Sequence, residues 1–174
     1  MFFTLITAQE SKPDIDRLIA EYSKSLTRLC YLMLKDVQLS EEAAWEALYK
    51  AYKGYGKFRG GSSEKTWISK IAINVCKSYM RKPSYKEITS DYISLSYASE
   101  DEEAYEFRSE ESLALLNAVY RLPIKYKQVI LLRYYQQMGV SEIAKILKEK
   151  ENTISVRIKR AHVMLKEKLK EDCL

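Results

Sequence analysis

The chain has 174 residues, 47% of them hydrophobic, which is enough for one ordinary domain or two small ones around a buried core. This composition excludes a disordered chain. The net charge of +5, from 29 Lys and Arg against 24 Asp and Glu, is too small to identify a partner, so the distribution of charge must be considered.

The cysteines and the first residues of the chain indicate its cellular compartment. Cys30, Cys76 and Cys173 are odd in number and form no CxxC pair, so we expect neither a disulfide framework nor a metal site. The apolar opening, residues 1–8, is too short for a signal peptide core or a membrane span. We therefore expect a soluble cytoplasmic protein.

Apolar residues recur at helical spacing almost throughout, no run of strict alternation occurs, and Gly and Pro number only five and three. These features predict an all-α fold of two small helical domains. The expected helices cover residues 15–33, 40–52, 66–81, 113–120, 124–136, 141–147 and 153–169. The segment between the two groups of helices has weak periodicity, which predicts a flexible linker. The expected division is 1–83, 84–111 and 112–174.

Charge is distributed unevenly along these segments. Residues 53–82 hold eight bases and one acid, residues 100–111 hold seven acids and one base, and residues 145–170 hold nine bases and three acids. The basic segments are typical of nucleic-acid binding, since Lys and Arg follow a phosphate backbone. The acidic run, residues 100–111, lies in the expected linker and gives it a negative charge.

The helix expected at 66–81 has two contrasting faces. Its apolar stripe is opposed by an acid-free polar face of Lys70, Asn74, Lys77 and Arg81. Bases can contact phosphates and Asn can pair with a base edge. A lysine-rich solvated face is the alternative. The preceding loop, from Phe58 to Lys65, carries two glycines, hydroxyls and bases.

The helix expected at 40–52 differs in charge. Glu42, Trp45 and Glu46 share an acidic face with a large aromatic residue, which suits a protein-binding patch. Along the same helix, Trp45 also falls in a stripe with Leu48, Tyr49 and Tyr52. We expect that stripe to belong to the core.

The last two expected helices, 141–147 and 153–169, are joined by a turn of about four residues, as in a helix-turn-helix. Asn152 and Thr153 offer an N-cap for the last helix. Its core stripe opposes a face of bases, a hydroxyl and small apolar groups, and no acid occurs from Ser155 to Lys166. Such a face suits the major groove of DNA, although two packed helices with a basic surface would look similar.

Catalytic chemistry finds no support in the sequence. His162, the only histidine, has no Ser or Cys partner in its neighbourhood, and we expect a surface or groove-edge position for it. There is neither a P-loop nor a GxGxxG motif. We therefore expect no enzymatic activity, no cofactor and no small-molecule substrate.

Short motifs in a fixed order carry a resemblance to bacterial RNA polymerase sigma factors of the extracytoplasmic-function (ECF) class. The N-terminal motifs are Ser40-Glu-Glu-Ala-Ala-Trp-Glu-Ala-Leu48, Phe58-Arg-Gly60, Thr66-Trp-Ile68 and Asn74. The C-terminal motifs are Arg121-Leu-Pro123, Val129-Ile-Leu-Leu-Arg-Tyr134, Glu142-Ile-Ala144 and Asn152-Thr-Ile154. Three positions depart from the family pattern. Trp45 replaces the Gln that is usual in the family, Asn152 replaces a Gly, and Lys148 replaces the glycine of the turn.

The resemblance implies a promoter-specificity subunit that binds the clamp and flap of core RNA polymerase, promoter double-stranded and melted DNA, and an anti-sigma factor. Region 2 (about 15–83) would dock on the clamp through Glu42, Trp45 and Glu46 and open the minus-10 element, and region 4 (about 112–169) would read minus-35. The implied minus-10 residues are Phe58, Arg59, Gly60, Ser62, Lys65, Lys70, Asn74, Lys77 and Arg81. The implied minus-35 residues are Val140, Ser141, Thr153, Ser155, Val156, Arg157, Lys159 and Arg160.

Two other functions are compatible with parts of the sequence. A stand-alone DNA-binding regulator would use the same helix-turn-helix, with the N-terminal group for dimerisation or sensing. A helical protein-interaction adaptor would carry its basic faces incidentally. The acidic patch with Trp45 and the loop before a basic helix favour the sigma factor. An anti-sigma factor would hold such a protein at the inner face of the membrane.

Overall fold

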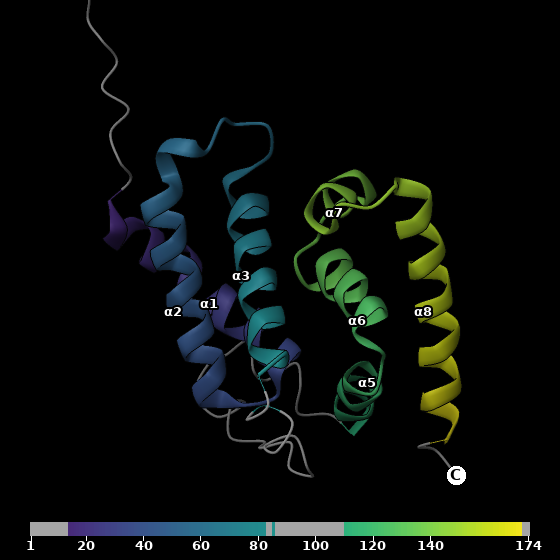
Figure 1. Cartoon of the computed structure of the whole chain (residues 1–174). Coiled ribbons are helices and arrows are strands. Elements are labelled where there is room, and N and C mark those ends of the chain that lie inside the picture. The colour runs from purple at the N-terminus through teal and green to yellow at the C-terminus, as the bar shows by residue number, and fades with distance from the viewer. Residues whose placement is uncertain (1–13, 83–84, 86–109, 172–174) are drawn as a thin grey trace, which may run out of the picture.

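The computed structural model describes residues 14–82, 85 and 110–171, and every regular element in these ranges is helical, which confirms the expected fold class (Figure 1). The elements are α1 (Ile15–Leu34), α2 (Val37–Gly54), the 3-10 helix η1 (Tyr55–Lys57), α3 (Glu64–Met80), α5 (Glu110–Tyr120), α6 (Ile124–Ile130), the π-helical η4 (Leu131–Tyr135), α7 (Val140–Leu147) and α8 (Glu151–Glu171). None of the described helices is long and apolar enough to cross a bilayer.

Helices α1, α2 and α3 form the first group. Asp14, Asp36 and Ser63 cap the three N-termini, each accepting a hydrogen bond from a backbone N–H in the first turn. Small residues on the inner face of α2, such as Ala43 and Ala47, are fully buried and let α1 approach closely. This group presents the outer faces of α2 and α3 to solvent.

The second group contains the expected helix-turn-helix, formed by α7 and α8. Helix α7 ends at Leu147 and is capped by Lys148, whose φ of 56° is left-handed and whose N–H donates to the carbonyl of Ala144. The turn geometry is therefore kept without the family's glycine, although a lysine is strained there. Helix α8 begins at Glu151, so the expected N-cap at Asn152 is wrong, because that residue already lies in the first turn.

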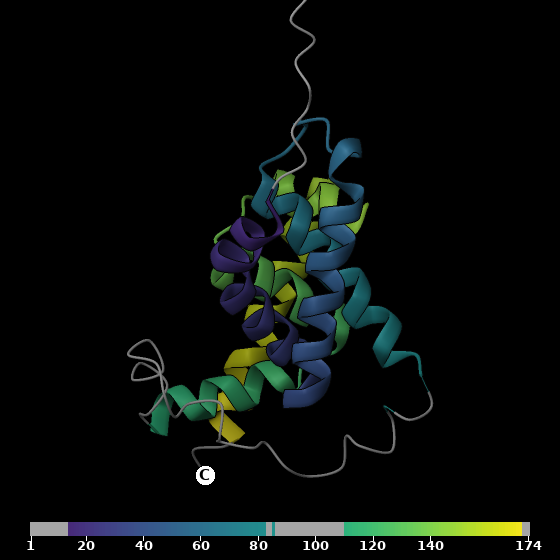
Figure 2. The same cartoon turned by 90° about the vertical axis from the view of Figure 1, so that its left-hand side faces the viewer.

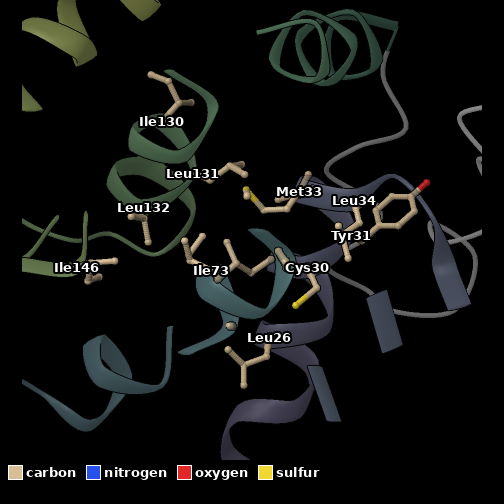
Figure 3. Packing of buried hydrophobic residues seen from close by; sticks show 14 of the residues in the cluster. Leu26, Cys30, Tyr31, Met33, Leu34, Ile73, Ile130, Leu131, Leu132 and Ile146 are labelled. Carbon is tan, nitrogen blue, oxygen red and sulfur yellow. The ribbon is translucent and has the colours of Figure 1, made fainter. Parts of the chain in front are cut away.

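The two groups pack against each other, and the views in Figures 1 and 2 are consistent with this contact. Helix α3 contacts α7, and α1 contacts η4. Figure 3 shows Met33 and Ile73 on one side of this contact, with Leu131 and Leu132 of η4 on the other. The Thr66 hydroxyl, on a residue only 3% exposed, donates to Glu142 at 2.8 Å. One continuous apolar core therefore joins the two groups.

Several expectations concern residues outside the described ranges. The linker expected at 84–111 is described only at Tyr85 and at its last two residues, which belong to α5. The Tyr85 hydroxyl donates to the carbonyl of Leu34 at 3.0 Å. The opening segment, residues 1–8, and Cys173 also lie outside the description. Cys30 and Cys76 are buried free thiols.

Candidate functional site

The polar face of α3 lies as the sequence predicts. Asn74 and Arg81 are exposed, Lys70 and Lys77 are half-buried, and the opposite stripe, with Ile68 and Ala72, is fully buried. Burial lowers the pKa of Lys77, and the neighbouring guanidinium groups of Arg81 and Arg157 lower it further. Positive charges therefore lie close enough on this face to repel one another, as is typical of a surface that binds an anion.

The loop between η1 and α3 is shorter than expected. Helix α3 begins at Glu64, because the Ser63 side chain caps it by accepting from the Thr66 N–H at 3.1 Å. The α2–α3 loop is therefore residues 58–63, and Lys65 is an exposed residue of α3. Gly60 has a φ of 68°, a conformation in which a side chain is strained. Arg59 and Gly60 are exposed, and Ser62 is half-buried.

Aromatic rings surround the start of this loop. Phe58 lies 5.0 Å from Trp67 and 5.8 Å from Tyr55, measured between ring centroids. Tyr55 and Trp67 meet edge to face at 5.9 Å. All three residues are partly exposed, so flat apolar surface borders the loop. The sequence identified Phe58 as a site residue but not Tyr55 or Trp67.

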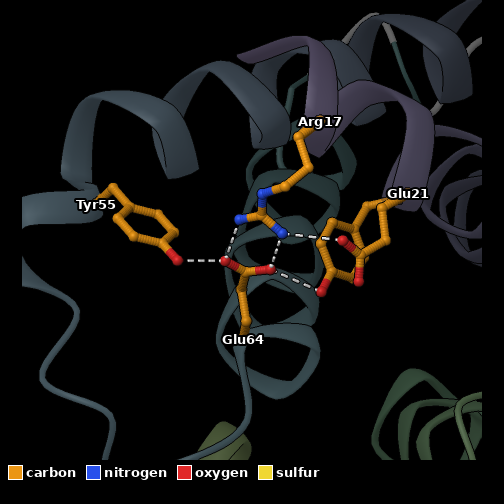
Figure 4. Close-up of polar contacts among 5 residues, drawn as sticks. Arg17, Glu21, Tyr55 and Glu64 are labelled. Atoms are coloured by element: carbon orange, nitrogen blue, oxygen red, sulfur yellow. Dashed lines mark hydrogen bonds and ion pairs between the residues drawn. The ribbon is translucent and has the colours of Figure 1, made fainter. Parts of the chain in front are cut away.

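Glu64 of α3, which sequence analysis missed as a site residue, binds charged and phenolic groups from two other elements, α1 and η1 (Figure 4). Both terminal nitrogens of Arg17 on α1 donate to its carboxylate, at 2.7 and 3.0 Å, and Tyr22 donates at 2.8 Å. The Tyr55 hydroxyl of η1 also donates to it. The hydrogen bonds from Arg17, first, and those from the tyrosines lower the pKa of Glu64 to about 2 despite its burial. The available signal was that Glu64 is the lone acid of residues 53–82.

The acidic face of α2 is exposed, but its aromatic residues are not where the stripe predicts. Trp45 is 56% exposed and Tyr49 is 55% exposed, so the prediction that they belong to the core is wrong; only Leu48 of that stripe is fully buried. The buried face of α2 is formed mainly by alanines instead, such as Ala43 and Ala47. Lys50 donates to Glu46 at 2.5 Å and lowers its pKa. Glu42 is exposed.

The outward face of α8 also follows the prediction. Val156, Lys159 and Arg160 are exposed, and the opposite stripe, with Ile154 and Ala161, is fully buried. The remaining expected residues of α7 and α8 are exposed or half-buried: Val140, Ser141, Thr153, Ser155 and Arg157. Arg157 pairs with Glu149 at 2.6 Å. His162 is exposed and bonded to the Tyr134 hydroxyl at 2.7 Å, which confirms its expected surface position.

A shallow pocket lies between α6 and the first turns of α8. Its volume is about 350 Å³, and it is lined by Lys125, Tyr126, Asn152, Thr153, Val156, Arg157 and Arg160. Three of these residues are cationic, which suits a phosphate. Lys125 and Tyr126 had no sequence signal, because only the fold brings α6 beside α8. Within the described ranges, no three His, Cys, Asp or Glu side chains are grouped as metal ligands would be.

Known proteins match both halves of the chain. Sigma-70 region 2 matches residues 18–84, and Sigma-70 region 4 matches residues 112–165. The chain is 28% identical over 160 residues to the RNA polymerase sigma-H factor of Pseudomonas aeruginosa, covering 86% of this chain and 83% of that protein. It is 29% identical over 167 residues to the ECF RNA polymerase sigma factor SigW of Bacillus subtilis, covering 86% of each.

Solved structures share the fold. The sigma factor RpoE of Bartonella quintana, in complex with the anti-sigma factor NepR, superposes with a TM-score of 0.71 at 22% identity, covering 90% of this chain and 97% of that one. CnrH, in complex with the cytosolic domain of CnrY, superposes with a TM-score of 0.66 at 16% identity, covering 91% and 88%.

Proposed function

The chain belongs to the sigma-70 family of bacterial RNA polymerase sigma factors, as a member of the ECF class, and we propose that its two helical groups divide the recognition of a promoter between them. As a sigma factor it binds core RNA polymerase and directs transcription initiation at promoters with minus-10 and minus-35 elements. Residues 1–83 would bind the minus-10 element and the polymerase clamp, and residues 112–174 would bind the minus-35 element. Residues 84–111 would be the linker. We infer no catalytic activity for it.

One observation supports this division most directly. The described chain carries two outward basic helix faces, on α3 and on α8, in separate halves of the sequence. Each face is opposed by a buried apolar stripe of its own helix, and both faces include exposed residues: Asn74 and Arg81 on α3, and Val156, Lys159 and Arg160 on α8. A single helix-turn-helix regulator would need only the second face.

At minus-10, the α2–α3 loop would receive a base extruded from the non-template strand. The exposed residues Arg59 and Gly60 and the half-buried Phe58 offer polar and stacking contacts. Asn74, Lys70, Lys77 and Arg81 would hold the adjacent strand. Unstacking a base costs a few kcal/mol, and binding of the extruded base together with backbone contacts can offset that cost without ATP.

At minus-35, α8 would lie in the major groove with Val156, Lys159 and Arg160 toward the bases. The pocket beside it would take a backbone phosphate, with Lys125 approaching from α6. Arg157 now pairs with Glu149, and it would exchange this partner for a phosphate on binding. Val140, Ser141, Thr153 and Ser155 would complete the contact.

On α2, Glu42, Trp45 and Glu46 would contact the polymerase clamp. An exposed tryptophan flanked by carboxylates has the character of an interface centre, since aromatic residues are enriched where proteins bind each other. The solved structure of RpoE, which shares this fold, is a complex with an anti-sigma factor, which supports such a partner for this chain. We propose a cytoplasmic location, at the inner face of the membrane when an anti-sigma factor tethers the chain.

The test is a pull-down with core RNA polymerase followed by transcription from a promoter library with the purified holoenzyme. We expect stable binding to core and transcripts from promoters that share two motifs about two helical turns apart. Absence of core binding would contradict the proposal. DNA binding without core would instead favour a stand-alone regulator built on the same helix-turn-helix.

A further inference from the structure

The base of the α2–α3 loop is closed by a polar cluster, here called the neck, which consists of Arg17, Tyr22, Tyr55 and Glu64. Tyr55 lies in η1, just before the loop, and Glu64 is the first residue of α3, just after it. The hydrogen bond from the Tyr55 hydroxyl to the Glu64 carboxylate therefore joins the two ends of the loop (Figure 4).

The neck is also fixed to the rest of the first helical group. Arg17 on α1 donates from both terminal nitrogens to Glu64, at 2.7 and 3.0 Å, which is the bidentate geometry that fixes a carboxylate in direction as well as position. Tyr22, 9% exposed, donates from the same helix at 2.8 Å. Glu64 therefore has hydrogen bonds on both carboxylate oxygens from α1 and η1.

The neck also holds the aromatic side of the loop. The Tyr55 ring contacts Phe58, the first loop residue, and Trp67, one turn into α3. Because the Tyr55 hydroxyl is bound to Glu64, rotation of the Tyr55 ring is restricted, and the Phe58 ring packs against both this ring and Trp67. A loop of six residues whose ends and first side chain are fixed loses little further entropy when it binds a ligand.

We propose that the neck is a positioning device for base capture: Glu64, through Arg17, Tyr22 and Tyr55, holds the α2–α3 loop in the shape that receives an unpaired base of the minus-10 strand. This inference rests on the proposed function of the loop. None of the four side chains needs to touch DNA for it. The neck acts by keeping Phe58 and the loop backbone ordered before the strand arrives.

The test compares holoenzymes carrying wild-type chain, Tyr55→Phe or Glu64→Gln in their affinity for a single-stranded minus-10 non-template oligonucleotide. The oligonucleotide is used intact and in versions that each lack one base. Tyr55→Phe keeps the ring and removes only the hydroxyl that closes the neck. Tyr52→Phe is the matched control, because Tyr52 is a half-buried tyrosine at the end of α2 whose hydroxyl is not among the partners of Glu64.

We expect Tyr55→Phe and Glu64→Gln to bind the intact oligonucleotide roughly threefold to tenfold more weakly than wild type, since the loop must then be ordered on binding. Tyr52→Phe should bind as wild type does. On the oligonucleotide that lacks the captured base, the deficit of Tyr55→Phe should vanish. Core affinity and the melting temperature of each chain are measured alongside, and Tyr55→Phe remains informative if Glu64→Gln folds poorly.

Two results would overturn the inference. Unchanged affinity of Tyr55→Phe for the intact oligonucleotide would show that the neck does not position the loop. An equal deficit on every oligonucleotide would show that it acts on the fold or on backbone contacts instead. Failure of the proposed function is distinguishable, because wild-type holoenzyme would then show no dependence on any single base.

Discussion

Glu64 shows what a single acid does among eight bases in residues 53–82. A solvated carboxylate there would only weaken attraction to DNA, but this one is 16% exposed and its charge is directed inward to Arg17. Its hydrogen bonds stabilise the ionised form, which is why its pKa is depressed to about 2. The positive field of the outer α3 face is therefore left largely uncompensated.

The depressed pKa predicts a pH-dependent contribution to stability. A carboxylate whose pKa falls from 4.5 in the unfolded chain to about 2 in the folded chain stabilises the fold above about pH 4.5, and this is lost as pH falls toward 2. Arg17 is 44% exposed, so solvent reduces the effect to roughly 1–2 kcal/mol. Glu64→Gln should therefore lower the free energy of unfolding by this amount at pH 7, and by less than half of it at pH 3.

Urea unfolding of wild type and Glu64→Gln at both pH values measures that difference. Glu21→Gln is the matched control, because Glu21 pairs with the same Arg17 at 2.9 Å but on an exposed surface. Its effect should stay under about 0.5 kcal/mol. An equal destabilisation by Glu64→Gln at pH 7 and pH 3 would contradict the assignment of the effect to ionised Glu64.

Single residues were the least predictable part of the site. The neck joins residues 47 positions apart, so no local pattern signals it. Trp45 and Tyr49 were predicted to be buried because they share a helical stripe with Leu48 and Tyr52, but the alanine face of α2 packs against α1 instead. Lys148 adopts the left-handed conformation in the turn before α8, at the position where the family pattern has a glycine, so its residue type did not signal this backbone geometry.

Helices were predicted well because each carries one apolar stripe, and burial of that stripe decides both the element and its inward face. The errors lie at helix ends. Helix α3 begins two residues earlier than predicted because Ser63 caps it, and α8 begins before Asn152. The faces of α3 and α8 were nevertheless assigned correctly, since a shift of a helix end does not rotate its stripe.

Helix α2 gives a prediction about core binding. Glu42→Lys together with Glu46→Lys should weaken the affinity for core RNA polymerase by about tenfold or more, because two carboxylates of an interface are reversed in charge. Competition with a labelled wild-type chain for core measures this. Asp16→Lys with Glu167→Lys, both exposed elsewhere, changes net charge equally and should leave the affinity unchanged. Equal loss in both variants would point to net charge rather than to this face.

The packing of the two groups matters at the scale of the whole molecule. Sequence predicted two domains but not their contact, because Thr66 and Glu142 are 76 positions apart and a segment of weak periodicity lies between them. The contact brings Lys77 of α3 near Arg157 of α8. Two promoter elements about two helical turns apart, roughly 70 Å, cannot be bound by faces this close together. Under the proposed division of the promoter between α3 and α8, binding would therefore require the groups to separate.

Energy transfer between dyes tests this separation. Dyes on Gln38→Cys and Lys166→Cys, exposed positions of α2 and α8, report on the two groups once Cys173 is replaced by Ser; Cys30 and Cys76 are buried. We expect high transfer in the free chain and low transfer in holoenzyme bound to a promoter. High transfer in the promoter complex would show that the groups stay packed and that one of the two faces is not used.

The division of promoter recognition between α3 and α8 is tested most directly by a footprint of purified holoenzyme on a mapped promoter. Wild type should protect two segments about two helical turns apart and unpair the downstream one. Lys159→Ala with Arg160→Ala should lose protection of the upstream segment while its affinity for core stays at the wild-type value. If that double variant keeps the upstream footprint, or loses binding to core, the assignment of minus-35 recognition to α8 is contradicted.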